Sequence, residues 1–202
     1  MINSFDTLVP APAAAYCQQL HQTYSFAFQL ARSRRSRLGD FRVWTDGRTQ
    51  ITVNADLNPW RFLITYVHEV AHAHVNKHNR RPTAPHGPAW QLAFQQLMQP
   101  LLTDAVFFHV VLEPLRQYLQ KPAATTYGNA TLTLALRQLD TASDRSAAAA
   151  SMTLADMAEG TVFTLNKKKY VRGTLRRTRV VCKELASGKS YTVVAHAWVE
   201  LA

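Results

Sequence analysis

Residues 68–72 read His-Glu-Val-Ala-His, and this motif constrains the chain more than any other feature of its sequence. An α-helix turns by about 100° per residue, so His68 and His72 lie one turn apart and only about 40° apart around the axis. Both imidazoles can therefore bind one ion, and Glu69 lies near enough to take a proton from a water at that ion. Two neutral nitrogen ligands, an open coordination position and a carboxylate are what metal-assisted hydrolysis requires.

The residues around the motif predict the helix that it needs. Asn58 can act as an N-cap and Pro59 suits the first helical position, so a helix is predicted from Pro59 to about Lys77. The Asn-Arg-Arg-Pro sequence at 79–82 then ends it. With 8 histidines in 202 residues, composition alone would give the motif roughly 0.01 times per chain. We therefore predict a catalytic type of zinc site, with one Zn²⁺ per chain.

Three histidines compete for the place of a third ligand. His74 falls on the apolar side of the helix and is expected to be a core histidine with a hydrogen-bond partner. His78 matches the longer pattern H-E-x-x-H-x-x-G-x-x-H, but Val75 stands where that pattern needs a glycine to turn the chain. His86 follows the predicted helix end and directly precedes Gly87-Pro88, where a new helix should begin. A chain that reverses there can bring His86 back to the same ion.

The rest of the N-terminal part is predicted to combine helices with a small sheet. An Asp-Gly turn at 46–47 between two alternating runs predicts a β-hairpin. The other predicted elements are a helix over 13–31 ending in the basic run 32–37, strands over 41–44 and 49–53, a helix from Pro88, and an apolar stretch over 104–120.

The C-terminal part has a different composition. All nine prolines lie between Pro10 and Pro122, and residues 141–151 are rich in Ala, Ser and Thr, which indicates a linker. Runs rich in Val, Thr and Tyr over 161–165, 170–185 and 190–201 predict a small antiparallel sheet of three strands. The predicted fold class is α+β. The predicted divisions are a first domain over 1–125, a linker or helical connector over 126–155, and a basic β module over 156–202.

The charge balance favours an anionic partner. The chain has 23 Lys and Arg against 13 Asp and Glu, which gives a formal net charge of +10. Such an excess points first to nucleic acid. Much of it gathers in the C-terminal module, with Tyr170 and Tyr191 close by, and DNA contacts are expected there. The candidate nucleic-acid contacts are Lys167, Lys168, Lys169, Arg172, Arg176, Arg177 and Arg179.

Other classes of protein are disfavoured by the sequence. Two cysteines, Cys17 and Cys182, are too few for a disulfide framework or an all-cysteine zinc site. No run approaches the roughly 18 apolar residues of a membrane span, and the N-terminal sequence lacks the regions of a signal peptide. The expectation is a soluble cytoplasmic protein with no membrane partner, which the predicted DNA binding could bring to the nucleoid. The sequence predicts no oligomeric state.

Several of these segments together resemble one known family. Ile51-Thr-Val-Asn54, Leu57-Asn-Pro59, the motif at 68–72 and His86-Gly-Pro-Ala-Trp90 are similar to segments of the SprT-like zinc metallopeptidases, the family that includes Spartan. In that family the third zinc histidine opens a His-Gly-Pro-x-aromatic motif about fifteen residues after H-E-x-x-H, and here His86 follows His72 by 14. The resemblance covers roughly residues 10–120.

The resemblance implies a fold and an activity. It implies a zincin-like metallopeptidase domain in which His68, His72 and His86 bind zinc and Glu69 acts as general base and then acid. The implied substrates are proteins associated with DNA. Many bacterial members end in a four-cysteine zinc ribbon, whereas the C-terminal part here has only Cys182, so a β module replaces the ribbon. The alternative is a nucleic-acid-associated binding protein that contains zinc and has no proteolytic activity.

Overall fold

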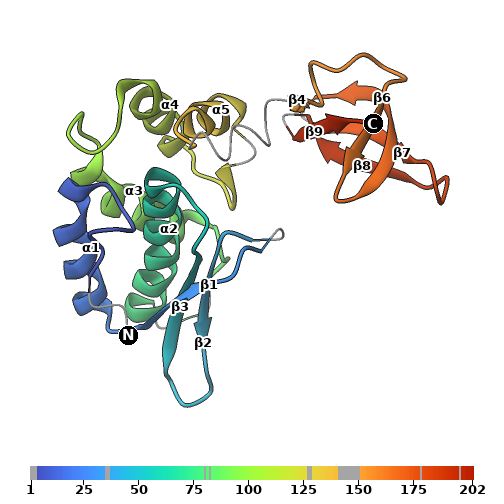
Figure 1. Cartoon of the computed structure of the whole chain (residues 1–202). Coiled ribbons are helices and arrows are strands. Elements are labelled where there is room, and N and C mark those ends of the chain that lie inside the picture. Colours follow the sequence, from blue (N-terminus) through green and yellow to red (C-terminus); the bar gives the residue numbers. More distant parts are fainter. Residues whose placement is uncertain are drawn as a thin grey trace. The chain divides into compact units, whose positions relative to one another are not determined.

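The computed structural model describes residues 4–34, 37–79, 81, 83–126, 129–140, 151–177, 179–195 and 197–202. The α+β class is confirmed: the described residues form five α-helices with a small mixed sheet, followed by an antiparallel sheet (Figure 1). The chain divides into two compact units, one of residues 1–126 and 134–139 and the other of residues 127–133 and 140–202. The predicted linker over 141–151 lies almost wholly outside the described residues.

The first unit contains a three-stranded sheet with the order β1-β3-β2. Strand β1 (Ala27–Ala31) is parallel to β3 (Thr49–Asn54), and β2 (Gly39–Val43) is antiparallel to β3. The predicted hairpin is confirmed, and Gly47 supplies the positive φ of 82° that its turn requires. Ile51, Val53 and Asn54 of the central strand are fully buried.

The predicted helix over 13–31 is wrong in its second half. Helix α1 (Ala11–Tyr24) ends where Ser25 adopts a left-handed conformation with φ of 52°, and residues 27–31 continue as β1. The basic residues Arg32 and Arg34 therefore follow a strand, in the connection from β1 to β2. Helix formation needs only local hydrogen bonds, whereas Ala27–Ala31 pairs with a strand more than twenty residues away, which a local pattern does not reveal.

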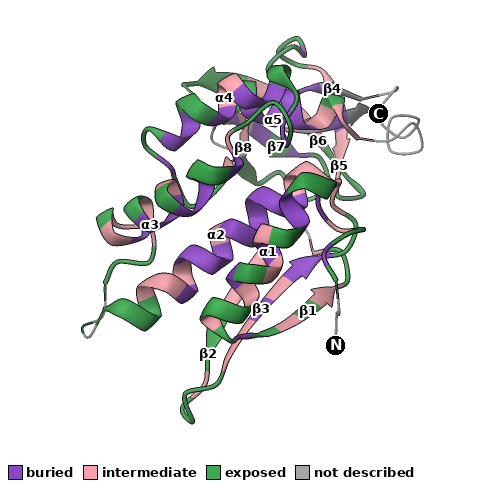
Figure 2. Ribbon diagram, turned by 90° about the vertical axis from the view of Figure 1, so that its left-hand side faces the viewer, coloured by how far each residue is buried: buried purple, intermediate pink, exposed green. Residues whose placement is uncertain are grey.

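Helix α2 (Pro59–His78) is the central element of this unit, and it begins and ends as predicted. The Asn58 side chain accepts a hydrogen bond from the Arg61 backbone N–H, the N-cap that the sequence predicts. The helix packs against α1, α3, β2 and β3, and it is buried along most of its length (Figure 2). The remaining helices are α3 (Pro88–Met98), the short 3₁₀ helix η1 (Gln99–Leu101), α4 (His109–Leu119) and α5 (Ala130–Gln138).

The second unit holds a six-stranded antiparallel sheet with the order β4-β9-β5-β6-β7-β8. One face packs on a small core that includes Leu154, Phe163, Val180 and Cys182. The strands are β4 (Ser151–Thr153), β5 (Val162–Leu165), β6 (Lys168–Arg176), β7 (Arg179–Glu184), β8 (Ser190–Val194) and β9 (Trp198–Leu201).

The prediction of three strands in this module is wrong. The run 170–185 contains two strands that turn after Arg176, where Arg177 has a φ of 50° without being glycine or asparagine. The run 190–201 likewise divides into β8 and β9. Strands β5 and β6 are joined by a two-residue turn at Asn166 and Lys167, which both have the positive φ that a type I′ hairpin turn requires.

None of the described helices has both the length and the hydropathy that crossing a bilayer requires.

Candidate metal centre

Three histidine side chains converge between α2 and the turn that precedes α3. His68 and His72 lie on the same face of α2, and His86 lies two residues before Pro88, where α3 begins. The chain reverses between the two helices, and α3 packs against α2. The Gly87 N–H donates to the Ala84 carbonyl oxygen at 3.0 Å, which closes a turn around His86. The reversal inferred from the break at 79–82 therefore brings His86 back to the motif.

The geometry of the three imidazoles fits a metal ion. The Nε2 atom of His86 lies 3.1 Å from the Nε2 atoms of both His68 and His72, and the three possible ligand atoms all lie within 4.8 Å of one another. Tetrahedral zinc with Zn–N bonds of about 2.0–2.1 Å holds two nitrogens about 3.3 Å apart. A neutral imidazole nitrogen carries at most one proton, so hydrogen bonds alone cannot satisfy three facing Nε2 atoms. A cation at their centre satisfies all three.

The surroundings keep these imidazoles in the neutral form that binds metals. Burial lowers the pKa of His68 to about 3, and the neighbouring His72 and His86 contribute in the same direction. Burial and His86 lower the pKa of His72 to about 4, and burial also lowers the pKa of His86. At neutral pH all three therefore offer a lone pair rather than a proton.

Aromatic rings fix the orientation of the three ligand side chains. The Trp90 ring is fully buried, and its centroid lies 4.5 Å from that of His68 and 4.7 Å from that of His86. The Phe41 ring from β2 is parallel to the ring of His72 within 7°, at 6.4 Å. The three donors are thus held by packing before any ion binds, which lowers the entropy cost of binding.

Glu69 lies beside the cluster in a buried environment, with only 7% of its surface exposed. Burial raises its pKa to about 8, and the Asp40 carboxylate contributes in the same direction. Arg34, a backbone hydrogen bond from Phe41 and Arg37 all act to lower that pKa. In the metal-free protein this carboxyl can therefore hold or release a proton near neutral pH, the range in which a general base or acid is most effective.

The other predicted histidines lie outside this cluster. His74 is half-buried and its Nδ1 lies 2.8 Å from the Tyr24 hydroxyl oxygen, so the expected hydrogen-bond partner exists. His78 is exposed, with its Nδ1 2.9 Å from the His74 carbonyl oxygen. Within the part of the chain that the structure describes, His68, His72 and His86 form the one group of three or more ligand-type side chains close enough to share an ion.

The structure divides the predicted nucleic-acid residues. Arg172 is buried and forms an ion pair with Glu159 at 3.6 Å, so it does not belong to the exposed basic surface. Lys168 is exposed and forms an ion pair with Glu184 at 2.7 Å. The others are exposed: Lys167, Lys169, Arg176, Arg177 and Arg179.

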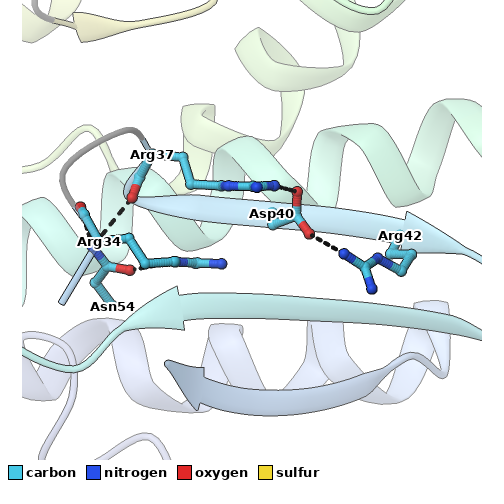
Figure 3. Close-up of polar contacts among 5 residues, drawn as sticks. All are labelled: Arg34, Arg37, Asp40, Arg42 and Asn54. Atoms are coloured by element: carbon cyan, nitrogen blue, oxygen red, sulfur yellow. Dashed lines mark hydrogen bonds and ion pairs between the residues drawn. The ribbon is translucent and has the colours of Figure 1, made fainter. Parts of the chain in front are cut away.

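The sequence patterns did not reveal a group of residues that act on Glu69 from the strand ends and from the β1–β2 connection. Asn54, Arg34 and Asp40 come from the ends of strands and from the connection between them, and no spacing in the sequence links them to the motif (Figure 3). The one signal in the sequence was Asn54 itself, a polar residue at the end of the strand that buries Ile51 and Val53.

Comparisons of this chain with protein-family models, with curated proteins and with solved structures give no match. The residues and geometry of the site therefore carry the functional argument.

Proposed function

We propose that the protein is a zinc-dependent metalloprotease of the SprT-like type, with a zincin-like first domain, that acts on DNA-associated proteins. The observation that carries the proposal is the convergence of three neutral imidazole nitrogens beside a buried carboxylate. Three protein ligands leave a coordination position open, which distinguishes catalytic from structural zinc sites. A structural site has no use for Glu69 at this place.

In this proposal each residue of the site has a defined role. His68, His72 and His86 would hold the ion, which when bound would act as a Lewis acid and lower the pKa of a water molecule. Glu69 accepts the proton of the attacking water and then delivers it to the leaving amine of the cleaved peptide bond. Its pKa, raised by burial and Asp40, suits both transfers.

The basic sheet of the second unit supports the proposed DNA partner. Strand register places Lys183 and Arg179 on the face of β7 opposite to its core residues, and Arg176 pairs directly with Arg179. Lys169 lies on the same face of β6. We call these four exposed residues the outward basic set: Lys169, Arg176, Arg179 and Lys183.

The two tyrosines lie on the other face of that sheet. Tyr170 pairs with Glu184 and Tyr191 pairs with Cys182, on the side of the small core. The outward basic set therefore lies on the face of the sheet that carries neither of these two tyrosines. We infer contacts with phosphates and little preference for base sequence, because cationic side chains contact the nucleic-acid backbone without reading base edges.

The decisive experiment compares Glu69→Gln with the wild-type protein. Both should bind one zinc, and the variant should cleave unfolded or DNA-bound protein substrates about 10²- to 10⁴-fold more slowly, because an amide cannot take the proton of water. The wild-type protein should cleave a substrate faster when that substrate is bound to DNA than when it is free. An active Glu69→Gln variant would refute the proposed role, and a zinc-loaded wild-type protein without activity on any of these substrates would favour the non-proteolytic binding protein.

A further inference from the structure

Asn54 is fully buried, and among the described residues its side-chain amide makes hydrogen bonds to one loop. Its side-chain oxygen accepts from Arg34 Nε at 2.8 Å, and its side-chain nitrogen donates to the carbonyl oxygens of Arg34 at 3.0 Å and Arg37 at 3.2 Å. Its backbone N–H donates to the Leu38 carbonyl oxygen at 2.9 Å. Figure 3 shows the contacts of the Asn54 side chain with Arg34 and Arg37 at the end of β3, beside the start of β2. One side chain thus fixes the connection between β1 and β2.

This connection ends at Gly39, which lies directly against Glu69. A Cβ atom on Gly39 would lie 2.5 Å from Glu69 Oε1 and 2.7 Å from Glu69 Cγ, and 2.9 Å from Thr65 Cγ2. Gly39 also pairs with Val53, the neighbour of Asn54 in β3. The backbone of the loop end therefore forms a wall that limits where the carboxylate can lie, and only a residue without a side chain fits there.

The same loop brings charge to the carboxylate. Arg34, held by Asn54, and Arg37, which binds Asp40 at 2.6 Å, both favour the ionised form of Glu69. Among the described residues, the buried Nη2 atom of Arg34 has no hydrogen-bond partner, whereas its Nε atom donates to Asn54. The hydrogen bond to Asn54 therefore helps to hold the Arg34 guanidinium where it acts on Glu69.

We propose that Asn54 is a positioning residue for the reaction. It anchors the β1–β2 connection, and the backbone of Gly39 at the end of that connection then holds the Glu69 carboxylate beside the histidine cluster. This inference rests on the proposed role of Glu69 as the proton acceptor. A displacement of about 1 Å in a catalytic group can cost about 10²-fold in rate. Loosening the wall should therefore affect turnover while leaving the three ligands in place.

The first test compares Asn54→Ala with Tyr66→Phe. The control also removes a buried hydrogen bond, from the Tyr66 hydroxyl to the Cys17 carbonyl oxygen at 3.0 Å, on the same helix but away from Glu69. Asn54→Ala should retain one zinc and show a kcat lower by about 10²-fold with KM unchanged. Tyr66→Phe should keep the wild-type kcat. Equal kcat values in the two variants, or loss of zinc from Asn54→Ala, would overturn the proposal.

The second test examines the contact between Gly39 and Glu69 through protein stability, so it does not depend on any enzymatic activity. Gly39→Ala should lower the melting temperature of the zinc-free protein by about 4 °C or more, and it should do so less in the Glu69→Ala background, where the shortened side chain leaves room for the new methyl group. Asn54→Ala should in turn reduce the effect of Gly39→Ala, because the released loop can move away. Additive effects in these two double-mutant cycles would refute the wall even if the protein proves to have no protease activity.

Discussion

The pH dependence of stability in the metal-free protein gives a sharp test of the environment of Glu69. Its pKa is raised from 4.5 to about 8 in the folded state, chiefly by burial. Between these values the unfolded chain carries an ionised carboxylate while the folded chain keeps its proton. The contribution of Glu69 to the free energy of unfolding is therefore fully present below pH 4.5. It is lost as the pH rises toward 8, by about 1.4 kcal/mol for each pH unit. The total loss by pH 8 amounts to at most about 4–5 kcal/mol.

Glu69→Gln should remove this loss, since a glutamine side chain stays neutral at every pH. The variant and the wild-type protein should have similar unfolding free energies near pH 4.5, and the variant should be more stable by up to about 4–5 kcal/mol at pH 8. His68 and His72 act in the opposite direction, because their lowered pKa values cost stability as the pH falls below 6.5. Both proteins share that contribution, so it cancels in the difference.

The assay is urea unfolding of chelator-treated protein at pH 4.5, 6, 7 and 8, followed by tryptophan fluorescence. Glu113→Gln is the matched control, because the Glu113 side chain is 45% exposed and forms a solvent-accessible ion pair with Arg116. That variant should differ from the wild-type protein by a small amount that changes little with pH. A stability difference for Glu69→Gln that is flat from pH 4.5 to 8 would show that the carboxylate is solvated, and the argument from burial would then be wrong.

Three other features of the structure can be tested by substitution. His86→Ala should lose zinc by elemental analysis, because two ligands hold the ion too weakly, whereas His78→Ala should keep one zinc per chain; the reverse result would make His78 the ligand. Replacing the outward basic set with Gln should lower the log–log salt slope of duplex DNA binding by about 0.9 for each phosphate that the protein no longer neutralises. The control variant replaces four exposed basic residues of the first unit with Gln, which changes the net charge equally and should leave that slope unchanged; they are Arg32, Lys77, Arg81 and Lys121. Equal slopes in the two variants would refute DNA binding by the outward basic set. Lys167→Gly should raise stability by up to about 1 kcal/mol in thermal unfolding, because φ is 65° at this turn position, and a decrease in stability would contradict the turn geometry.

The sequence determined the parts of the site that depend on local hydrogen bonds. Asn58, Pro59 and the spacing of His68 and His72 define the start of α2 and the face on which two imidazoles meet, because an i to i+4 ladder involves only near neighbours. The break after His78 and the Gly87-Pro88 start also lie within a few residues of what they specify. These local signals therefore favour His86 over His74 and His78 as the third ligand.

Tertiary structure alone decided where strands begin and end and what lies behind Glu69. Residues 27–31 are apolar enough for a helix or a strand, and their parallel pairing with β3 selects the strand. In the second unit the turn at Arg177 has no glycine or asparagine to mark it, and pairing between β6 and β7 fixes it. Gly39 meets the helix that carries Glu69, and its pairing with Val53 in β3 places it next to Asn54. Partners in a sheet are remote in sequence, so the hydrogen bonds and close contacts that they create leave no local pattern to read.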